Sequence, residues 1–256
     1  MDTHNNNVEP LFSHMVMRHG PVGLLSRAIL KAEDAVRQQG VILSFATFKQ
    51  LLEANQANSA TWLPIVTTFD CRYSDLEEAN AFCILGRDRQ GDVVACQAAR
   101  FFDWTNSSFR EEAQSLRLFY HEPREAKLPN ERCEVSALAA RGTTGRVLYS
   151  GGAWYRRDFR GKGLVEYLPR IARAYAHTLW NIDCTVTLMA EAVVKGGVFP
   201  RNGYRNIEWA VDLLGTRLGD MHAAYLWIKQ DEMLDDLSAF LGSERPEADL
   251  RVRAVR

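Results

Sequence analysis

The sequence predicts an α+β protein built on a mixed, mostly antiparallel sheet. Two apolar runs within 81–102 are separated by a turn and form a hairpin. A helix with apolar residues at helical spacing, 163–180, follows the strand-like run 146–155 and precedes the β-branched run 184–190. Two further strands, within 204–229, end the sheet. The order of helices, hairpin, strand–helix–strand and final antiparallel pair allows one crossover and therefore one parallel pair of strands.

Composition limits the classes of function. The chain has 256 residues, 46% hydrophobic and 25% charged, so it can bury a sizeable core. Its 31 basic and 32 acidic residues give a net charge of −1, which provides no overall field for nucleic acid or an anionic membrane. No apolar run approaches the roughly 20 residues of a membrane span. We therefore expect a cytoplasmic protein with neither a nucleic-acid nor a membrane partner.

The cysteines and histidines do not form a recognisable metal site. The five cysteines are odd in number and contain no C-x-x-C pair, so we expect free thiols. The six histidines contain no H-x-x-x-H or H-E-x-x-H pattern that would bring two side chains onto one helical face. No metal is predicted.

Before the hairpin the sequence predicts mostly helix. Pro21 begins and Gly40 ends a helix whose inward face is Leu24, Leu25, Ala28, Ile29, Ala32 and Val36. A short strand, 41–45, and a second helix, 48–58, come next, and 62–73 is an irregular link. Residues 1–60 are thus expected to be an N-terminal helical extension of a single domain that covers 1–241.

Between the hairpin and the end of the chain we expect an insertion, further strands and a tail. Ser107 or Ser108 caps an inserted helix that extends to about Tyr120. The remaining expected segments are a charged loop at 123–129, strands at 133–138, 146–155, 184–190, 204–214 and 222–229, helices at 163–180, 192–199 and 231–241, and a polar C-terminal tail at 242–256.

The stretch between 146–155 and 163–180 is a glycine-rich turn from a strand to a helix. Gly161 and Gly163 allow a tight turn and expose successive N–H groups at the positive end of the helix dipole, which suits a phosphate-sized anion. Basic residues add to that field: Arg156, Arg157, Arg160 and Lys162. Neither G-x-x-x-x-G-K-[ST] nor G-x-G-x-x-G is present, so nucleotide hydrolysis and dinucleotide binding are not indicated. The alternative is a basic surface turn between two core elements.

Two motifs resemble those of the GNAT superfamily of acyl-CoA N-acyltransferases. The first is R-x-x-G-x-[small] at Arg160, Gly163 and Val165, although Val165 stands where the family usually has Gly or Ala. The second is 198–204, where an aromatic residue is followed by a Gly and an aromatic that begin a strand about forty residues after the glycine turn. The resemblance extends over about 20–230.

The resemblance implies a GNAT-like sheet whose fourth and fifth strands splay apart to admit the pantetheine arm of an acyl-CoA. Acetyl-CoA or another acyl-CoA would be the co-substrate. A backbone N–H of the fourth strand would face the thioester oxygen, where negative charge grows during attack by an amine. The residues that would contact acyl-CoA are Trp154, Tyr155, Arg156, Arg160, Gly161, Lys162, Gly163, Leu164, Val165 and Phe199.

Acyl transfer also requires an acid for the leaving thiolate and a base for the ammonium. The family usually places a Tyr acid where this chain has Phe199. The thiolate could instead take its proton from water, from Tyr204 or from Tyr155. The other alternative is that the protein has lost turnover. Glu191, at the end of the strand 184–190, is the first candidate for the base, with Glu134 and His222 behind it. The alternative for the glutamates is an ordinary solvated carboxylate at the end of a strand, and the alternative for His222 is a histidine that belongs to the core.

The expected function is acyl-CoA-dependent N-acyltransfer, with acetyl as the expected acyl group, to a primary amine by direct attack. The acceptor would be a small-molecule or peptide amine, and the resemblance leaves room for a homodimer. The alternative is a GNAT-like module that binds or senses acyl-CoA without turnover. Phe199 and Val165 favour that alternative, whereas the basic cluster and the strand context favour the enzyme.

Overall fold

The computed structural model describes residues 9–199 and 201–243, so the expected tail at 242–256 lies outside the described residues beyond Ser243. Among these residues the strands form one sheet, in the order β1-β2-β3-β5-β6-β8-β7-β4. The strands are β1 (Ile42–Ala46), β2 (Ala81–Arg87), β3 (Val93–Trp104), β4 (Arg132–Val135), β5 (Gly145–Tyr155), β6 (Cys184–Ala190), β7 (Asn206–Thr216) and β8 (Gly219–Lys229).

The helices are of two kinds, α and short 3₁₀. The α-helices are α1 (Val22–Gln38), α2 (Phe48–Ala57), α3 (Phe109–Gln114), α4 (Pro123–Ala126), α5 (Ala139–Gly142), α6 (Leu164–Trp180), α7 (Glu191–Lys195) and α8 (Gln230–Gly242). The 3₁₀ turns are η1 (Leu11–His14), η2 (Thr67–Phe69) and η3 (Arg157–Phe159). None of the helices in the described residues is both long enough and apolar enough to cross a bilayer.

The expected α+β class and mostly antiparallel sheet are confirmed. The pair β5–β6 is parallel, the other neighbouring pairs are antiparallel, and α6 is the crossover between the parallel strands. The segment between β3 and β5 crosses to the far edge of the sheet, where its strand β4 pairs with β7.

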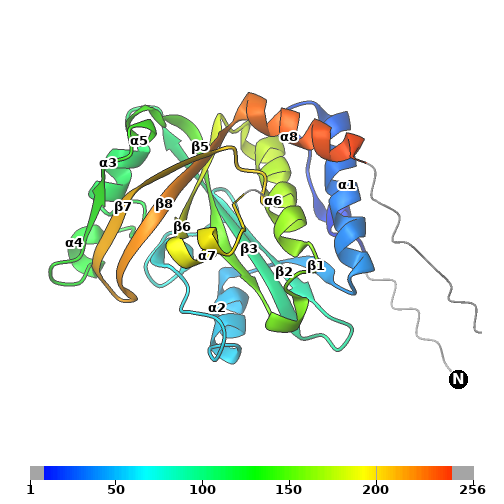
Figure 1. Cartoon of the computed structure of the whole chain (residues 1–256), viewed down its shortest axis with the longest axis horizontal. Coiled ribbons are helices and arrows are strands. Elements are labelled where there is room, and N and C mark those ends of the chain that lie inside the picture. The colour runs from blue at the N-terminus through cyan, green and yellow to red at the C-terminus, as the bar shows by residue number, and fades with distance from the viewer. Residues whose placement is uncertain (1–8, 200, 244–256) are drawn as a thin grey trace, which may run out of the picture.

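Helices cover both faces of the sheet, and each face has its own apolar core. Figure 1 shows α1, α6 and α8 together on one side, and α3, α4 and α5 grouped at the other end of the molecule. The first core joins α1, α6 and α8 to one face of the sheet, and the expected inward residues of α1 are buried in it apart from Leu24, which is partly exposed. The second core joins α2, α3 and α5 to the opposite face. We refer to these as the α6 face and the α2 face.

The inserted helix differs from expectation. Ser108 caps α3, because its hydroxyl accepts a hydrogen bond from the backbone N–H of Glu111, as the sequence indicated. The helix ends at Gln114 instead of reaching Tyr120, because Leu116 adopts a left-handed conformation with φ of 65°. Residues 115–120 therefore form an irregular segment that packs on the α2 face.

Candidate active site

Strands β5 and β6 pair over three positions and then separate. Their parallel register ends at Tyr149 opposite Val186. Beyond that pair β5 continues along β3 and β6 continues along β8. The facing edges of 150–155 and 187–190 therefore have no strand partner on that side within the described chain. The splay implied by the resemblance is thus present between the fourth and fifth strands of its scheme, which are β5 and β6 here. We call this opening the β5–β6 split.

A β-bulge shapes the β5 side of the split. The register between β3 and β5 shifts so that Gly152 and Ala153 lie opposite the single residue Gln97. Gly152 has a φ of 60°, and a Cβ on Gly151 would lie 2.9 Å from the Phe69 ring. Both positions therefore require glycine. The strand predicted at 146–155 is therefore interrupted by a bulge, for which two successive glycines inside a strand pattern are a recognised signal.

The glycine turn leaves a row of backbone donors without protein partners. Gly161 and Gly163 both have a φ of 80°, and Gly163 is the N-cap of the 17-residue α6. Within the described part of the chain, the N–H groups of 161–165 donate no hydrogen bond to the protein. A Cβ on Gly161 would meet no atom within 4 Å, so the approach to these groups is open. The turn has the geometry of an anion site at a helix N-terminus.

The basic residues of the turn do not all add free charge to it. Arg156 forms ion pairs with Asp88 at 2.7 Å and Asp158 at 2.8 Å, and these carboxylates raise its pKa. It therefore ties η3 to the turn between β2 and β3. Arg160 donates from Nε to the Tyr155 carbonyl at 3.1 Å, and Lys162 lies 3.9 Å above the Phe159 ring. Arg156 orders the turn, whereas Arg160 and Lys162 form no ion pair with a carboxylate of the described residues. The hydrogen bond from Arg156 is the main cause that lowers the pKa of the Asp158 carboxyl, and Lys162 lies close enough to lower it further.

The side chains next to the turn divide between the two faces. Leu164 is buried in the α6-face core, while Val165 is half-buried in the first turn of α6. Trp154 points to the α2 face, where it stacks on Trp62 at 4.5 Å. Tyr155 packs on the α6 face.

Several buried polar atoms on the α6 face have no hydrogen-bond partner among the residues that the structure describes. Gln97 donates from Nε2 to Ser150 Oγ at 3.1 Å, but its Oε1 is unpaired. The hydroxyls of Tyr155 and Tyr204 are also unpaired, as are two nitrogens of the fully buried Arg173. Buried polar groups are normally paired by protein, water or ligand. This polar cluster, from the elements beside the split, is suited to the amide and carbonyl groups of a pantetheine arm.

Tyr204 lies inside this cluster. Its hydroxyl faces Ser150 and Arg173 without completing a hydrogen bond, and the Arg173 guanidinium lies 5.0 Å from the ring. Burial raises the pKa of Tyr204 to about 12, in opposition to the nearby guanidinium, which lowers it. The phenol is therefore protonated at neutral pH. Phe199, Tyr155 and Tyr204 all belong to or pack on the core of the α6 face.

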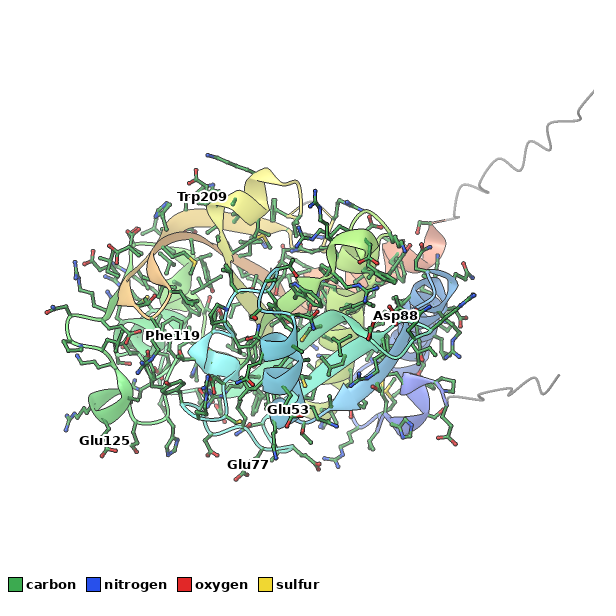
Figure 2. All side chains as sticks on the ribbon, turned by 90° about the horizontal axis from the view of Figure 1, so that it is seen from below. Glu53, Glu77, Asp88, Phe119, Glu125 and Trp209 are labelled. Carbon is green, nitrogen blue, oxygen red and sulfur yellow. The ribbon has the colours of Figure 1, made fainter. Side chains whose placement is uncertain are left out.

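The candidate bases form a separate group on an exposed part of the sheet. Glu191 begins α7, and its carboxylate accepts from Lys195 at 2.6 Å; this hydrogen bond lowers the pKa of Glu191, with a smaller contribution from His222. His222 contacts Asp212 through Nδ1 at 2.6 Å and stacks on Trp209, which is labelled in Figure 2. A neutral His222 ring that donates Nδ1–H to Asp212 presents an unprotonated Nε2.

Glu134 belongs to the same exposed surface. It lies opposite Asp212 in the β4–β7 register and pairs with Arg132 at 2.8 Å. The three base candidates from the sequence lie on β4, on β8 and just after the end of β6, whereas Tyr204 is buried.

A cavity of about 160 Å³ lies on the α2 face and reaches the split. Tyr149 and Leu188, which flank the split, are part of its lining. The irregular link contributes residues between Pro64 and Tyr73 and the insertion contributes residues between Leu116 and Tyr120, whereas no described residue of α1 or α2 lines the cavity. The β7–β8 turn and the strand ends beside it also line the cavity, with Thr216, Arg217, Leu218 and Met221, and no local sequence pattern indicated this. We call this space the α2-face cavity.

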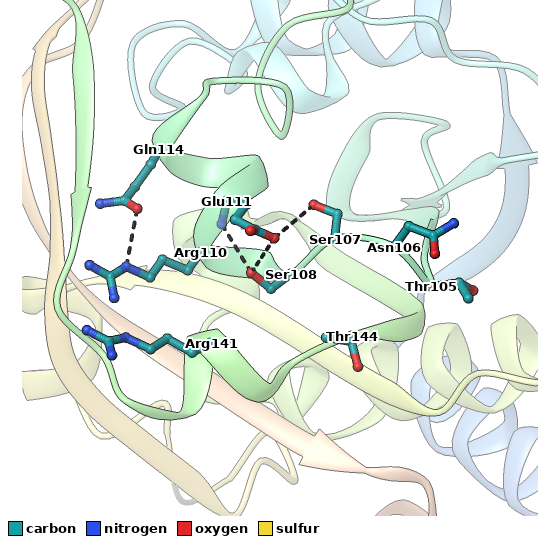
Figure 3. A pocket seen from close by; sticks show the side chains of 9 residues that line it. All are labelled: Thr105, Asn106, Ser107, Ser108, Arg110, Glu111, Gln114, Arg141 and Thr144. Carbon is teal, nitrogen blue, oxygen red and sulfur yellow. Dashed lines mark hydrogen bonds between the residues drawn. The ribbon is translucent and has the colours of Figure 1, made fainter.

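A second, wider hollow of about 660 Å³ surrounds the start of α3, away from the split (Figure 3). Its polar lining includes Arg110, which donates to Gln114 at 3.2 Å, and Ser108, which bonds Glu111 at the helix cap. The hollow contains none of the residues that the sequence indicated for catalysis or acyl-CoA binding.

Comparisons with known proteins find similarity in structure but no match in sequence. No protein-family model matches the chain, and no curated protein matches it in sequence. The chain is similar to NAA60 of Arabidopsis thaliana, solved with acetyl-CoA, at 7% identity and a TM-score of 0.45, over 75% of this chain and 99% of that one. It is also similar to a spermidine N-acetyltransferase chimera from Vibrio cholerae and hSSAT, at 10% identity and a TM-score of 0.41, over 77% and 99% of the two chains. At these identities the likeness concerns the course of the chain and says nothing about its chemistry.

Proposed function

We propose that this protein is an acyl-CoA-dependent N-acyltransferase that transfers an acyl group, most simply acetyl, from a thioester to a primary amine by direct attack. One observation supports the proposal above the others. The β5–β6 split opens directly beside a glycine turn with five successive unpaired N–H groups. A ligand that combines a pyrophosphate with an extended amide-bearing arm fits both features at once.

The residues that would hold acyl-CoA follow from this geometry. The N–H groups of 161–165, with Arg160 and Lys162, would bind the pyrophosphate. The free edge of β5 from Ser150 to Tyr155 would bind the pantetheine arm. Acyl-CoA supplies the activated acyl group. The α2-face cavity would admit the amine from the opposite face of the sheet, because Tyr149 and Leu188 belong both to its lining and to the strands of the split.

The transfer requires two proton movements. The amine nitrogen forms a bond to the acyl carbon, the carbon–sulfur bond breaks, and the proton that leaves the nitrogen is balanced by one that the thiolate takes up. We propose Tyr204 as the donor to the thiolate, because it is the protonated phenol of the cluster beside the split. For the base we propose Glu191, acting directly or through water, with Glu134 and His222 as alternatives on the same surface.

A second candidate function is acyl-CoA binding without turnover. Two observations favour it: Phe199 offers no hydroxyl, and Glu191 is an exposed, ion-paired carboxylate with a lowered pKa. Lowering the pKa of a carboxylate weakens it as a base.

Thermal unfolding with and without acetyl-CoA tests whether either function applies. A ligand that binds the folded state alone adds about 2.7 kcal/mol to the free energy of unfolding at a hundredfold excess over Kd. A rise in melting temperature with acetyl-CoA, and with desulfo-CoA, supports both candidates. No change at millimolar ligand would reject both.

A further inference from the structure

The α2-face cavity extends from the split toward the β7–β8 turn, because residues of both line it. Leu188, at the split, pairs with Tyr225 of β8, and Met221 lies four residues closer to the β7–β8 turn. At about 3.3 Å per residue this places the backbone at these two lining positions on the order of 13 Å apart. Glu131 and Arg217 line the end beside the turn. The apolar part of the lining includes Ile65, Val66, Leu116, Phe119, Leu213 and Met221.

Most charges along the cavity are neutralised within the protein. Asp70 is buried, and its carboxylate accepts three hydrogen bonds from the Arg72 guanidinium, at 2.9, 3.2 and 2.6 Å. Arg132 pairs with Glu134 at 2.8 Å. Arg217 is exposed, donates to the Ala126 carbonyl at 3.0 Å and lies over the Tyr73 ring. Its charge is therefore open to solvent.

Glu131 is different. It is 7% exposed, and its carboxylate accepts hydrogen bonds from the Tyr120 hydroxyl at 2.7 and 2.8 Å and from the Leu128 N–H at 2.8 Å. These donors are neutral, and no basic side chain in the described residues forms an ion pair with Glu131. Burying an unpaired charge is costly. A cation that enters the cavity would offset that cost.

We infer that the acceptor is an elongated primary amine with an apolar middle and a second cationic group, and that Glu131 binds this second group at the far end of the cavity. The reacting amine then lies beside Tyr149 and Leu188, and Tyr120 fixes the orientation of the Glu131 carboxylate. This inference rests on the proposed function for its assignment of the α2-face cavity to the acceptor.

Three amines with the same six-carbon chain test the inference: hexylamine, 1,6-diaminohexane and 6-aminohexanoate. With acetyl-CoA saturating, kcat/KM for the diamine should exceed that for hexylamine by roughly 10- to 100-fold, the value of a hydrogen bond to a charged group. Glu131→Gln should remove the preference by raising KM for the diamine, while kcat and the KM for hexylamine stay within about twofold.

Two further variants separate binding from folding. Glu125→Gln makes the same chemical change on exposed α4, where Figure 2 shows Glu125 at the periphery, and it should keep the preference. Glu131→Asp keeps the charge but withdraws it by one methylene, so the preferred substrate should become 1,7-diaminoheptane. This shift is expected even if Glu131→Gln does not fold.

Equal kcat/KM for the three amines would overturn the inference and leave a cavity selective for apolar chains alone. Preference for 6-aminohexanoate that disappears in Arg217→Gln would overturn it in favour of an anionic end. If acetyl-CoA binds but no amine is acylated, the proposed function fails separately. Calorimetric titration of the acetyl-CoA complex with the same amines then decides: tighter diamine binding that Glu131→Gln abolishes supports the inference, and equal binding contradicts it.

Discussion

Tyr149 on β5 and Val186 on β6 form the last pair before the two strands separate. The next residue of β5, Ser150, accepts a hydrogen bond from Gln97 on the α6 face, whereas Tyr149 lines the cavity on the α2 face. Neighbouring residues of a strand point to opposite faces. The β5–β6 split therefore connects the polar cluster around Tyr204 with the proposed acceptor cavity.

Substituting Gly161 tests the anion site with an internal control. Gly161→Leu places a side chain over the unpaired N–H groups and should abolish the thermal shift with acetyl-CoA. Gly40→Leu is the matched control, because Gly40 has a similar φ of 77° and equally open surroundings but lies between α1 and β1. Each substitution should cost about 1–2 kcal/mol of stability from left-handed strain. Loss of the shift in both variants, or in neither, would contradict the assignment.

Long periodic elements were predictable from the sequence, because their pattern alone determines them. The helix predicted at 163–180 and the strand at 184–190 agree closely with α6 and β6. The end of α3 was not predictable, because nothing in the residue type of Leu116 indicates a positive φ. The pairing of β4 with β7 was also hidden, since it joins segments more than 70 residues apart.

Part of the candidate site was also predictable, because it is built from residues that are close together in the sequence. The glycine turn is local, so its sequence indicated its geometry. Arg156 was expected to contribute free charge, but Asp88 comes from the distant β2–β3 turn and neutralises it. Glu131 and the β7–β8 turn could not be assigned to the cavity, because only the tertiary fold brings them together.

Replacing Tyr204 tests its role as the acid. Tyr204→Phe removes a buried hydroxyl that has no hydrogen-bond partner, so the free energy of unfolding should change little. Thiol release should fall by roughly 10²-fold or more if this phenol protonates the thiolate. Phe199→Tyr should leave the rate unchanged or raise it modestly. A rate within about twofold of the original for Tyr204→Phe would assign the proton to water.

The pH dependence of Glu191→Gln tests the base. The hydrogen bond from Lys195 lowers the pKa of Glu191, so its carboxylate remains ionised throughout the neutral range. The rate should therefore rise with pH through the pKa of the amine, and Glu191→Gln should be slowest relative to the original protein below that pKa. Rate profiles from pH 6 to 10 measure this. A ratio of the Glu191→Gln rate to the original rate that is the same at every pH would exclude Glu191 as the base. The control is Glu53→Gln, at an exposed position of α2.

His177 should make stability depend on pH. It is fully buried in α6, Nδ1 contacts the Ile182 carbonyl at 3.2 Å, and burial lowers its pKa. Between this lowered pKa and the usual value of about 6.5, the unfolded chain binds a proton that the folded chain does not. The free energy of unfolding should therefore fall with decreasing pH in this window, by at most about 1.4 kcal/mol per pH unit.

Denaturant unfolding at pH 5.5, 6.5 and 7.5 measures the slope. His177→Gln should reduce it, whereas the exposed His121→Gln should not. An unchanged slope in His177→Gln would show that other groups cause the dependence.

The most direct test of the proposed function is mass spectrometry of the reaction products after incubation with acetyl-CoA and a panel of primary amines, with free thiol measured in parallel. The account predicts one acetylated amine for each thiol released, at a rate well above the blank without protein. Binding of acetyl-CoA with no amine accelerating thiol release above that blank would contradict it and leave acyl-CoA binding without turnover as the function.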